Sequence, residues 1–219
     1  MGQSFLKIWR KVKYDNMNEI KPNNNLKTTI ETITEKTAKD IKWGLWAGVG
    51  AFFYGSNREP TDIDIMVRNS DMQRLANCLD EFMVMQPKVV EKDMFRVPLA
   101  KFKINDYEVE TCSDMTITLE GKKYTFKCDE LLIRKMRKID IDNINVPVVS
   151  PEDIIVVKAI CQRGKEKGKY DVEDVSNILK NQEVDWDYLR KRTQLTQSYD
   201  RVFGLLNRLG YHDQRKSGS

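Results

Sequence analysis

A glycine-punctuated apolar run at residues 43–55, WGLWAGVGAFFYG, is followed at once by an alternating segment at residues 61–67, TDIDIMV. The apolar run predicts a short strand, a tight turn at Gly48 and a buried helix that ends near Gly55. The alternation predicts a strand with one buried face, because successive side chains point to opposite sides of a strand. The two segments therefore place strand, helix and strand in immediate succession.

Within the second segment, Asp62 and Asp64 would project together from one face of the strand, while Ile63 and Ile65 enter the core. Neighbouring carboxylates repel each other unless a cation joins them, and Mg²⁺ prefers oxygen ligands and completes its shell with phosphate and water. Transfer at phosphorus uses such ions to activate the attacking hydroxyl and to neutralise the leaving pyrophosphate. The plainer interpretation is a solvated strand face, which is the commoner origin of an isolated Asp-x-Asp pair.

The rest of the chain divides into a strand-rich part and a helical part. Helical spacing of apolar residues predicts one helix over residues 26–41, after a cap at residues 23–25, and another over residues 71–82. Period-two runs predict strands at residues 96–104 and 107–113, near 117 and 124–126, and in a hairpin that runs from beyond Leu131 to residues 146–150. After Pro151, helices are predicted at residues 151–162, 171–181, 186–193 and 197–209. The predicted fold class is α+β, with a mixed β-sheet flanked by helices and a C-terminal helical region.

The length of 219 residues allows one large domain, or a domain with a smaller appendage. We expect an N-terminal extension at residues 1–25, a core at 26–150 and a helical region at 151–216, with residues 217–219 a remnant of cloning. The net charge of +4 is mild. It suits a local basic patch for NTP or RNA and falls short of a dedicated nucleic-acid coat.

Cysteine usage and hydropathy indicate the compartment. The four cysteines lie far apart, without the paired spacing of a zinc site, and are expected to be reduced thiols. No apolar run approaches the length of a membrane span, and the first residues contain neither a cleavable apolar segment nor a myristoylation signal. We therefore expect a cytoplasmic protein without a membrane partner.

Polar residues between the glycine turn and the acidic strand are suited to phosphate. Gly48 has no side chain, so backbone N–H groups beside it could approach an anion. Ser56 and Arg58 supply a hydroxyl and a guanidinium for phosphate oxygens. Alternatively, Gly48, Gly50 and Gly55 only permit tight helix packing, which would leave the polar loop and the two acids unexplained.

A lone charge in an apolar helix is the third feature. Lys158 is the only charged residue within residues 154–161, so its helix should be buried. Such a lysine either extends to the surface or points into a polar cleft. The following loop, residues 163–169, holds one arginine and three lysines, a composition that is usually just solvated. Asp171 and Asp174 could cap the next helix.

Two segments together resemble a known superfamily. They are AGVGAFFYGSNREPTDIDIMV at residues 47–67 and SPEDIIVVKAICQRGKEKGKYDVEDVSNIL at residues 150–179. The glycine turn, short helix and acid-x-acid strand, then the lysine-bearing helix, basic loop and acidic helix start, resemble the polymerase-beta-like nucleotidyltransferase superfamily. The resemblance is closest to its small prokaryotic group, which includes AbiEii-type and MenT-type toxin enzymes. The chain departs from the family pattern at the turn, where Ala47 and Gly48 replace the usual Gly-Gly or Gly-Ser.

The resemblance implies Mg²⁺, or Mn²⁺ in its place, held by Asp62, Asp64 and a third carboxylate. Within the strand YEVETC the third carboxylate would be Glu110, with Glu108 as the alternative nearer the turn, although both could be ordinary surface acids. The residues that the resemblance places around the nucleotide and its phosphates are Gly48, Ser56, Arg58, Lys158, Arg163, Lys169 and Asp171.

The function implied is transfer of a nucleoside monophosphate from an NTP to an acceptor hydroxyl. The basic loop and the toxin-like resemblance favour RNA, particularly a tRNA end, as the acceptor, and leave a protein hydroxyl or a small molecule open. The alternative is a non-catalytic module that binds nucleotide or a partner, as one half of a toxin and antitoxin pair. The departure at Ala47 is the feature that favours this alternative.

Overall fold

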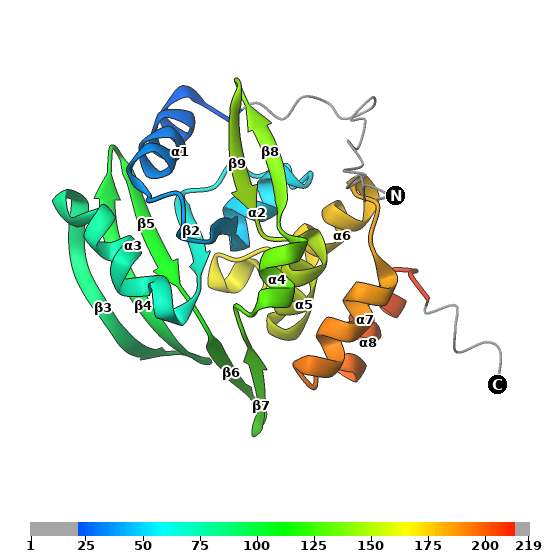
Figure 1. Ribbon diagram of the computed structural model, residues 1–219. Coiled ribbons are helices and arrows are strands. Elements are labelled where there is room, and N and C mark those ends of the chain that lie inside the picture. The colour runs from blue at the N-terminus through cyan, green and yellow to red at the C-terminus, as the bar shows by residue number, and fades with distance from the viewer. Residues whose placement is uncertain (1–21, 213–219) are drawn as a thin grey trace, which may run out of the picture.

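A computed structural model describes residues 22–212, in which eight α-helices flank one mixed β-sheet (Figure 1). Most of the expected N-terminal extension and the expected remnant at residues 217–219 lie outside the described residues. Within residues 22–212, no helix has both the length and the apolar character needed to cross a membrane.

The nine strands found among the described residues form a single sheet. They are β1 (Trp43–Trp46), β2 (Asp62–Val67), β3 (Met83–Lys92), β4 (Phe95–Ile104), β5 (Tyr107–Cys112), β6 (Met115–Leu119), β7 (Lys122–Phe126), β8 (Arg137–Ile141) and β9 (Ile144–Val148). The order is β7-β6-β4-β5-β2-β1-β9-β8, with β3 also paired to β4. The β2–β5 and β1–β9 pairs are parallel and the other pairs are antiparallel. The predicted α+β class is confirmed.

The helices close to the sheet and beyond it agree with the sequence pattern in most places. They are α1 (Asn24–Lys36), α2 (Ala47–Phe53), α3 (Met72–Cys78), α4 (Glu130–Lys135), α5 (Pro151–Cys161), α6 (Asp171–Asn181), α7 (Trp186–Leu195) and α8 (Tyr199–Arg208). The Asn23 side chain caps α1 by accepting a hydrogen bond from the Leu26 N–H at 2.7 Å. All four helices predicted after residue 150 are present, with ends within two residues of the expected ones.

Helix α5 lies at the centre of the molecule. All eleven of its residues are buried. It packs against α2, which follows β1, and against α6, α7 and α8 of the helical region (Figure 1). Pro151 occupies its first turn, and the Ser150 hydroxyl accepts a hydrogen bond from the Asp153 N–H at 3.2 Å. Because every side of α5 is covered, Lys158 on this helix must find its partners inside the protein.

A buried ion network ties α5 to α7 and to the start of α4. Arg192 is 1% exposed, and its Nε lies 2.6 Å from Asp153 Oδ1. Its Nη1 donates to Asp129 Oδ2 at 2.9 Å. The Tyr188 hydroxyl donates to Asp153 Oδ2 at 2.7 Å. The positive charge of Arg192 therefore offsets the two carboxylates within the fold.

Several local expectations were wrong. The helix predicted to reach residue 41 ends at Lys36. The helix predicted to reach residue 82 ends at Cys78. Strand β3 was not expected, because Pro87 interrupts its pattern and Val89 is 52% exposed on an edge strand that needs little apolar alternation. The residues after Leu131 form α4 before the β8–β9 hairpin begins. The turn after β1 was expected at Gly48, but the positive φ, +50°, belongs to Ala47, the first residue of α2, and Gly48 is the second residue of that helix.

Candidate active site

The acidic residues of β2 and β5 stand side by side on one face of the sheet. In the parallel β2–β5 pairing, Asp62 is opposite Glu108 and Asp64 is opposite Glu110. Ile63 between the two aspartates is fully buried, whereas both aspartates are half-buried. The alternation read from the sequence is therefore confirmed, and it brings four carboxylates into two adjacent rows.

The electrostatics of Asp64 reflect its burial and the carboxylates beside it. Partial burial, and then the nearby charges of Asp62 and Glu110, raise the pKa of Asp64 to about 7. The charges of Lys169 and Lys158 act in the opposite direction. Lys158 and Lys169, which belong to the helical region, therefore lie within electrostatic reach of the acidic strand.

The donor set around Asp64 fits a hard divalent cation. Carboxylate oxygens are the protein ligands that Mg²⁺ takes, usually one or two of them with water and phosphate completing the shell. In the described part of the chain, no three or more histidine, cysteine, aspartate or glutamate side chains are grouped to hold a metal. Asp62, Asp64 and Glu110 therefore do not form a ready three-ligand group, although their carboxylates are on adjacent strands and are of the kind that such an ion binds.

Glu110 and Glu108 share one lysine of the next strand. Lys101 on β4 is directly opposite Glu110 in the antiparallel β4–β5 pairing. Its Nζ lies 2.8 Å from Glu108 Oε1 and also forms an ion pair with Glu110 Oε1. The hydrogen bond from Lys101 lowers the pKa of Glu108, which is the more exposed of the two glutamates. Glu110 is the glutamate that stands beside Asp64, as the family resemblance implies.

Lys158 neither reaches the surface nor faces open solvent. It is 7% exposed, and its Nζ lies 2.6 Å from Asp174 Oδ2 and 3.4 Å from Asp171 Oδ1. The Ser56 hydroxyl donates to the other oxygen of Asp174 at 2.6 Å. These contacts join the loop before β2 to α5 and α6. Asp174 and Asp171 do not cap α6, because their side chains are used here and no side chain caps that helix.

Arg163 extends this cluster toward the sheet. Its Nε donates to Asp171 Oδ2 at 2.8 Å, and its backbone N–H donates to the same oxygen at 3.0 Å. Burial works against the charge of Arg163, but Asp171 outweighs it and raises the pKa of the guanidinium. The guanidinium also lies 5.2 Å from the centroid of the Phe95 ring on β4. We call these five residues, Ser56, Lys158, Arg163, Asp171 and Asp174, the α5–α6 cluster.

Two cations at the edge of the cluster have no ion pair within residues 22–212. The Arg58 guanidinium lies 4.7 Å from the centroid of the Tyr170 ring, and its Nε is buried without a hydrogen-bond partner among the described residues. Lys169 is exposed in the loop that leads to α6. Both are therefore available to an anion.

The glycines of α2 and the following turn separate into two kinds. A Cβ atom on Gly50 would lie 2.6 Å from Ile154 Cδ1, and one on Gly55, where φ is +107°, would lie 2.6 Å from Asn181. A Cβ atom on Gly48 would meet nothing within 4 Å. The packing interpretation therefore accounts for Gly50 and Gly55 but not for Gly48.

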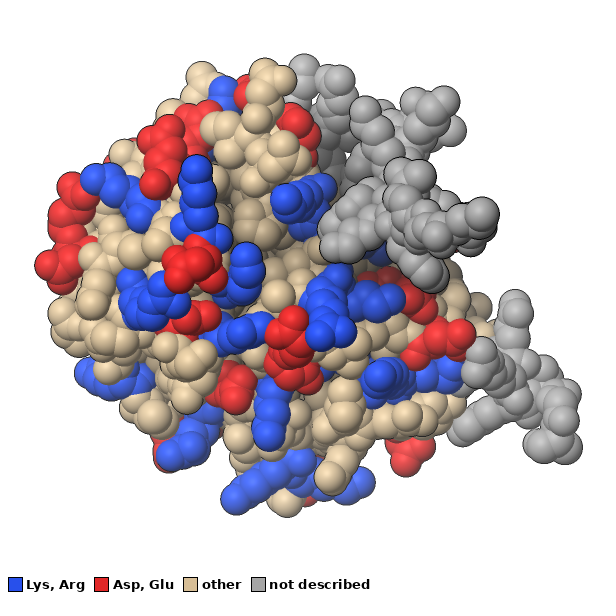
Figure 2. Space-filling model, in the orientation of Figure 1, with Lys and Arg blue, Asp and Glu red and all other residues tan. Residues whose placement is uncertain are grey.

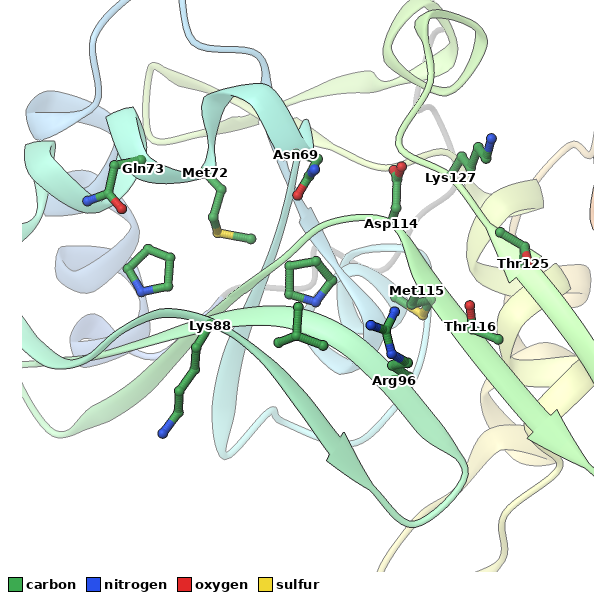
Figure 3. Close-up of a pocket in the computed structure, with 13 residues that line it drawn as sticks. Asn69, Met72, Gln73, Lys88, Arg96, Asp114, Met115, Thr116, Thr125 and Lys127 are labelled. Carbon is green, nitrogen blue, oxygen red and sulfur yellow. The ribbon is translucent and has the colours of Figure 1, made fainter.

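A cavity at the other side of the sheet lies apart from the acidic residues. A cavity of about 520 Å³ is bordered by α3, β3, β4, β6 and β7, and Figure 3 shows Met72, Arg96 and Asp114 around it. Arg96 is an odd number of residues from Lys101 on β4, so it faces the opposite side of the sheet from Glu110. This cavity is not part of the acidic site.

Charge is distributed in small groups over the visible surface. Figure 2 shows lysine and arginine side chains interspersed with acidic ones across one face of the protein, consistent with the net charge of +4. No broad basic surface is seen on this face, so the cations that act on the acidic strand are identified by their individual contacts and charges.

Comparison with known proteins assigns this arrangement to a family. Residues 51–211 match the family model described as "Uncharacterised nucleotidyltransferase". The chain belongs to this nucleotidyltransferase family. The match contains the acidic strands and the α5–α6 cluster, and it supports the superfamily that the sequence motifs resemble. The narrower AbiEii-type and MenT-type group is not confirmed by it.

Solved structures resemble this chain at low sequence identity, and the first of the following has a TM-score above 0.5, which shows a likeness of fold. A candidate nucleotidyltransferase from Thermotoga maritima is 17% identical with a TM-score of 0.53, over 65% of this chain and 86% of that one. A lincosamide antibiotic adenylyltransferase, LnuA, bound to lincomycin, is 17% identical with a TM-score of 0.44, over 74% and 99%. An antigenic nucleotidyltransferase-like protein from Paracoccidioides brasiliensis is 14% identical with a TM-score of 0.45, over 88% and 95%. No curated protein matches the chain in sequence.

Three contacts of the nucleotidyltransferase site were not anticipated from its sequence. Lys101 could have been found, because the two-residue turn after Ile104 fixes the hairpin register and sets Lys101 opposite Glu110. The contact between Arg58 and Tyr170, and the pairing of Asp174 with Lys158, join segments more than a dozen residues apart. No local pattern in the sequence specifies such contacts.

Proposed function

We propose that this nucleotidyltransferase moves a nucleoside monophosphate from an NTP to an acceptor hydroxyl, with pyrophosphate as the leaving group. The observation that carries the proposal is the pair Asp62 and Asp64 on one strand face, with Asp64 aligned with Glu110 and within electrostatic reach of Lys158 and Lys169. Phosphoryl transfer needs carboxylates that hold a divalent cation beside cations that bind polyphosphate. Both groups are present on adjoining elements here.

In this proposal Asp62 and Asp64 hold Mg²⁺, for which Mn²⁺ can substitute, and Glu110 contributes to the ion beside the acceptor hydroxyl. When bound, the ions supply neutralisation of the polyphosphate and a lower pKa for that hydroxyl. The hydroxyl oxygen forms a bond to the α-phosphorus while the bond from this phosphorus to pyrophosphate breaks. The carboxylates hold the hydroxyl in line and accept its proton directly or through water.

In the proposal the polyphosphate is held by Arg58 and Lys169, neither of which has an ion pair among residues 22–212. Gly48 leaves room for the phosphates beside its backbone. The α5–α6 cluster supplies further positive charge through Lys158 and Arg163, and Asp171 orients both of these side chains. A direct contact of Ser56 or Lys158 with phosphate would require each to leave Asp174.

For the acceptor we place RNA first, particularly a tRNA end. The loop at residues 163–169 is basic and largely exposed beside the acidic strand, and lysines and arginines in such loops bind the phosphates of a nucleic-acid backbone. A protein hydroxyl and a small molecule are the other acceptors that the test must include.

The test incubates the purified protein with each α-³²P-labelled NTP, MgCl₂ and total RNA. We expect labelled RNA with the wild-type chain, and a loss of at least about 1,000-fold with Asp62→Asn, because this substitution removes charge where the metal is held. The matched control is Asp93→Asn, which removes an exposed carboxylate at the β3–β4 turn and should leave the rate unchanged.

Parallel reactions replace RNA with a cell protein extract or with an aminoglycoside and a lincosamide. If a protein or an antibiotic is labelled instead of RNA, the proposal of catalysis stands and the proposed acceptor changes. NTP binding without transfer to any acceptor would overturn the catalytic proposal and favour the nucleotide- or partner-binding half of a toxin and antitoxin pair.

A further inference from the structure

Lys101 forms an ion pair with both glutamates of β5, which differ in exposure and in the aspartate of β2 that each one adjoins. Its Nζ lies 2.8 Å from Glu108 Oε1 and pairs with Glu110 Oε1. Glu110 is aligned with Asp64, whereas Glu108 is aligned with Asp62 and is more exposed, with 55% of its side chain accessible against 26% for Glu110. One cation is thus held between a glutamate near the proposed metal position and one nearer to solvent.

The arrangement has a consequence for ligand exchange. A carboxylate whose oxygen is paired with an ammonium group has one fewer lone pair for a second cation, and two cations brought close together repel. A divalent ion bound by Glu110 beside Asp64 would bring a second positive charge close to the Lys101 ammonium, and the repulsion favours release of Glu110 by Lys101. Glu108 already contacts that ammonium, so Lys101 can release Glu110 without losing its charge partner.

We infer that Lys101 is a positioning residue that holds Glu110 in the metal-free protein and transfers fully to Glu108 when a divalent cation binds. The inference rests on the proposed metal-dependent function. It gives distinct roles to the two glutamates, since Glu110 exchanges a lysine for a metal ion and Glu108 retains the lysine. It also predicts that Lys101 competes with the metal.

Isothermal titration calorimetry of the full chain with MnCl₂ alone tests the competition. We expect Lys101→Met to bind Mn²⁺ about five- to ten-fold more tightly than the wild-type chain, because a partly buried ion pair no longer competes for Glu110. Lys101→Arg retains an ion-pairing group and should bind no more tightly than the wild type. Melting curves without metal establish that each variant is folded.

Lys103 provides the matched control for charge alone. It lies two residues along β4 on the same face, opposite Glu108, and its Nζ donates to the Asp106 carbonyl oxygen at 2.6 Å. Lys103→Met removes the same charge without freeing Glu110, and we expect the Mn²⁺ affinity to change by less than about two-fold. Equal tightening in Lys101→Met and Lys103→Met would overturn the inference.

Glu108→Gln tests the transfer of the lysine. Without its second partner, Lys101 should remain on Glu110, so we expect weaker Mn²⁺ binding by about three-fold or more. In the Lys101→Met background the same substitution should have little effect, and an equal effect in both backgrounds would overturn the role of Glu108. If the wild-type chain binds no Mn²⁺, the metal-dependent function and this inference both fail. Binding without the expected differences overturns the inference alone.

Discussion

Two buried ion networks in this protein use the same kinds of side chain but differ in what adjoins them. In the α5–α6 cluster, Lys158 pairs with Asp174 and Asp171, and its charge acts on Asp64 of the acidic strand. In the other network, Arg192 pairs with Asp153 and Asp129 and lies against the Phe126 ring, 4.7 Å from its centroid. Burial of charge is common to both, so it does not by itself identify the site. The α5–α6 cluster differs in that its lysine acts on Asp64, and for Asp62 and Asp64 no ion pair is found within residues 22–212.

The largest expected effect belongs to the network without such neighbours. Arg192→Met leaves Asp153 and Asp129 without their cation, and we expect the free energy of unfolding to fall by about 3–5 kcal/mol. The dissociation constant for ATP with Mg²⁺, measured at a temperature where the variant is folded, should stay within about two-fold of the wild type. Urea denaturation and calorimetry measure the two quantities. A large loss of ATP affinity in a stable variant would remove the distinction between the networks.

The pH dependence of the free energy of unfolding distinguishes the contribution of the acidic strand from that of the rest of the protein. Because the pKa of Asp64 is raised to about 7 from its ordinary value of 3.8, the folded state retains a proton that the unfolded state loses. The stability of the metal-free protein should therefore decline as the pH rises from about 4 to about 7, by about 2–4 kcal/mol through this group. Urea denaturation of Asp64→Asn across this range should lack that component, while Arg192→Met should retain it. An identical pH dependence in wild type and Asp64→Asn would contradict the coupling.

Lys158→Met should affect both stability and nucleotide binding. Asp174 keeps the Ser56 hydroxyl and Asp171 keeps Arg163, so the loss of stability should be about 2–3 kcal/mol, less than for Arg192→Met. We also expect the ATP dissociation constant to rise by more than about ten-fold, since positive charge beside the phosphates is lost. Loss of stability with unchanged ATP affinity would make the α5–α6 cluster a purely structural network like that of Arg192.

The smallest effects are expected within α2. One of its glycines tests tight packing, and the other tests whether phosphate can approach the backbone. Gly50→Ala should cost about 1–2 kcal/mol, because its Cβ would meet Ile154 in a tightly packed interior. Gly48→Ala should be neutral or stabilising by about 0.5 kcal/mol, because the space is open and alanine favours a helix. The Gly48 variant should nevertheless bind ATP about three-fold or more weakly if phosphate approaches there. Unchanged ATP affinity would place Gly48 outside the site.

The parts of the fold that the sequence predicts are those in which local pattern and tertiary burial agree. Alternation from Asp62 to Ile65 requires one apolar face, and the sheet buries that face. Strand β3 escapes prediction because an edge strand exposes much of both faces and tolerates Pro87. The turn at Ala47 is also not predicted. Alanine has no preference for a positive φ, so only the packing around this residue imposes the conformation.

The candidate site likewise contains residues that local pattern predicts and residues that only tertiary packing brings together. Asp62, Asp64 and Glu110 lie on regular strands, so their common face follows from strand periodicity and register. The residues that bind Lys158 come from α6, and the packing of α5 against α6 determines which aspartates it meets. Asp174 was for that reason expected to cap a helix rather than to neutralise a lysine.

The burial of α5 on all sides has a consequence for biosynthesis. Its covering elements are α2, made more than ninety residues earlier, and α6 to α8, which end at Arg208. During translation α2 can cover one side of α5 at once, whereas the apolar sides that α6 to α8 cover remain exposed until α8 has left the ribosome, and we expect a chaperone to bind the nascent chain there.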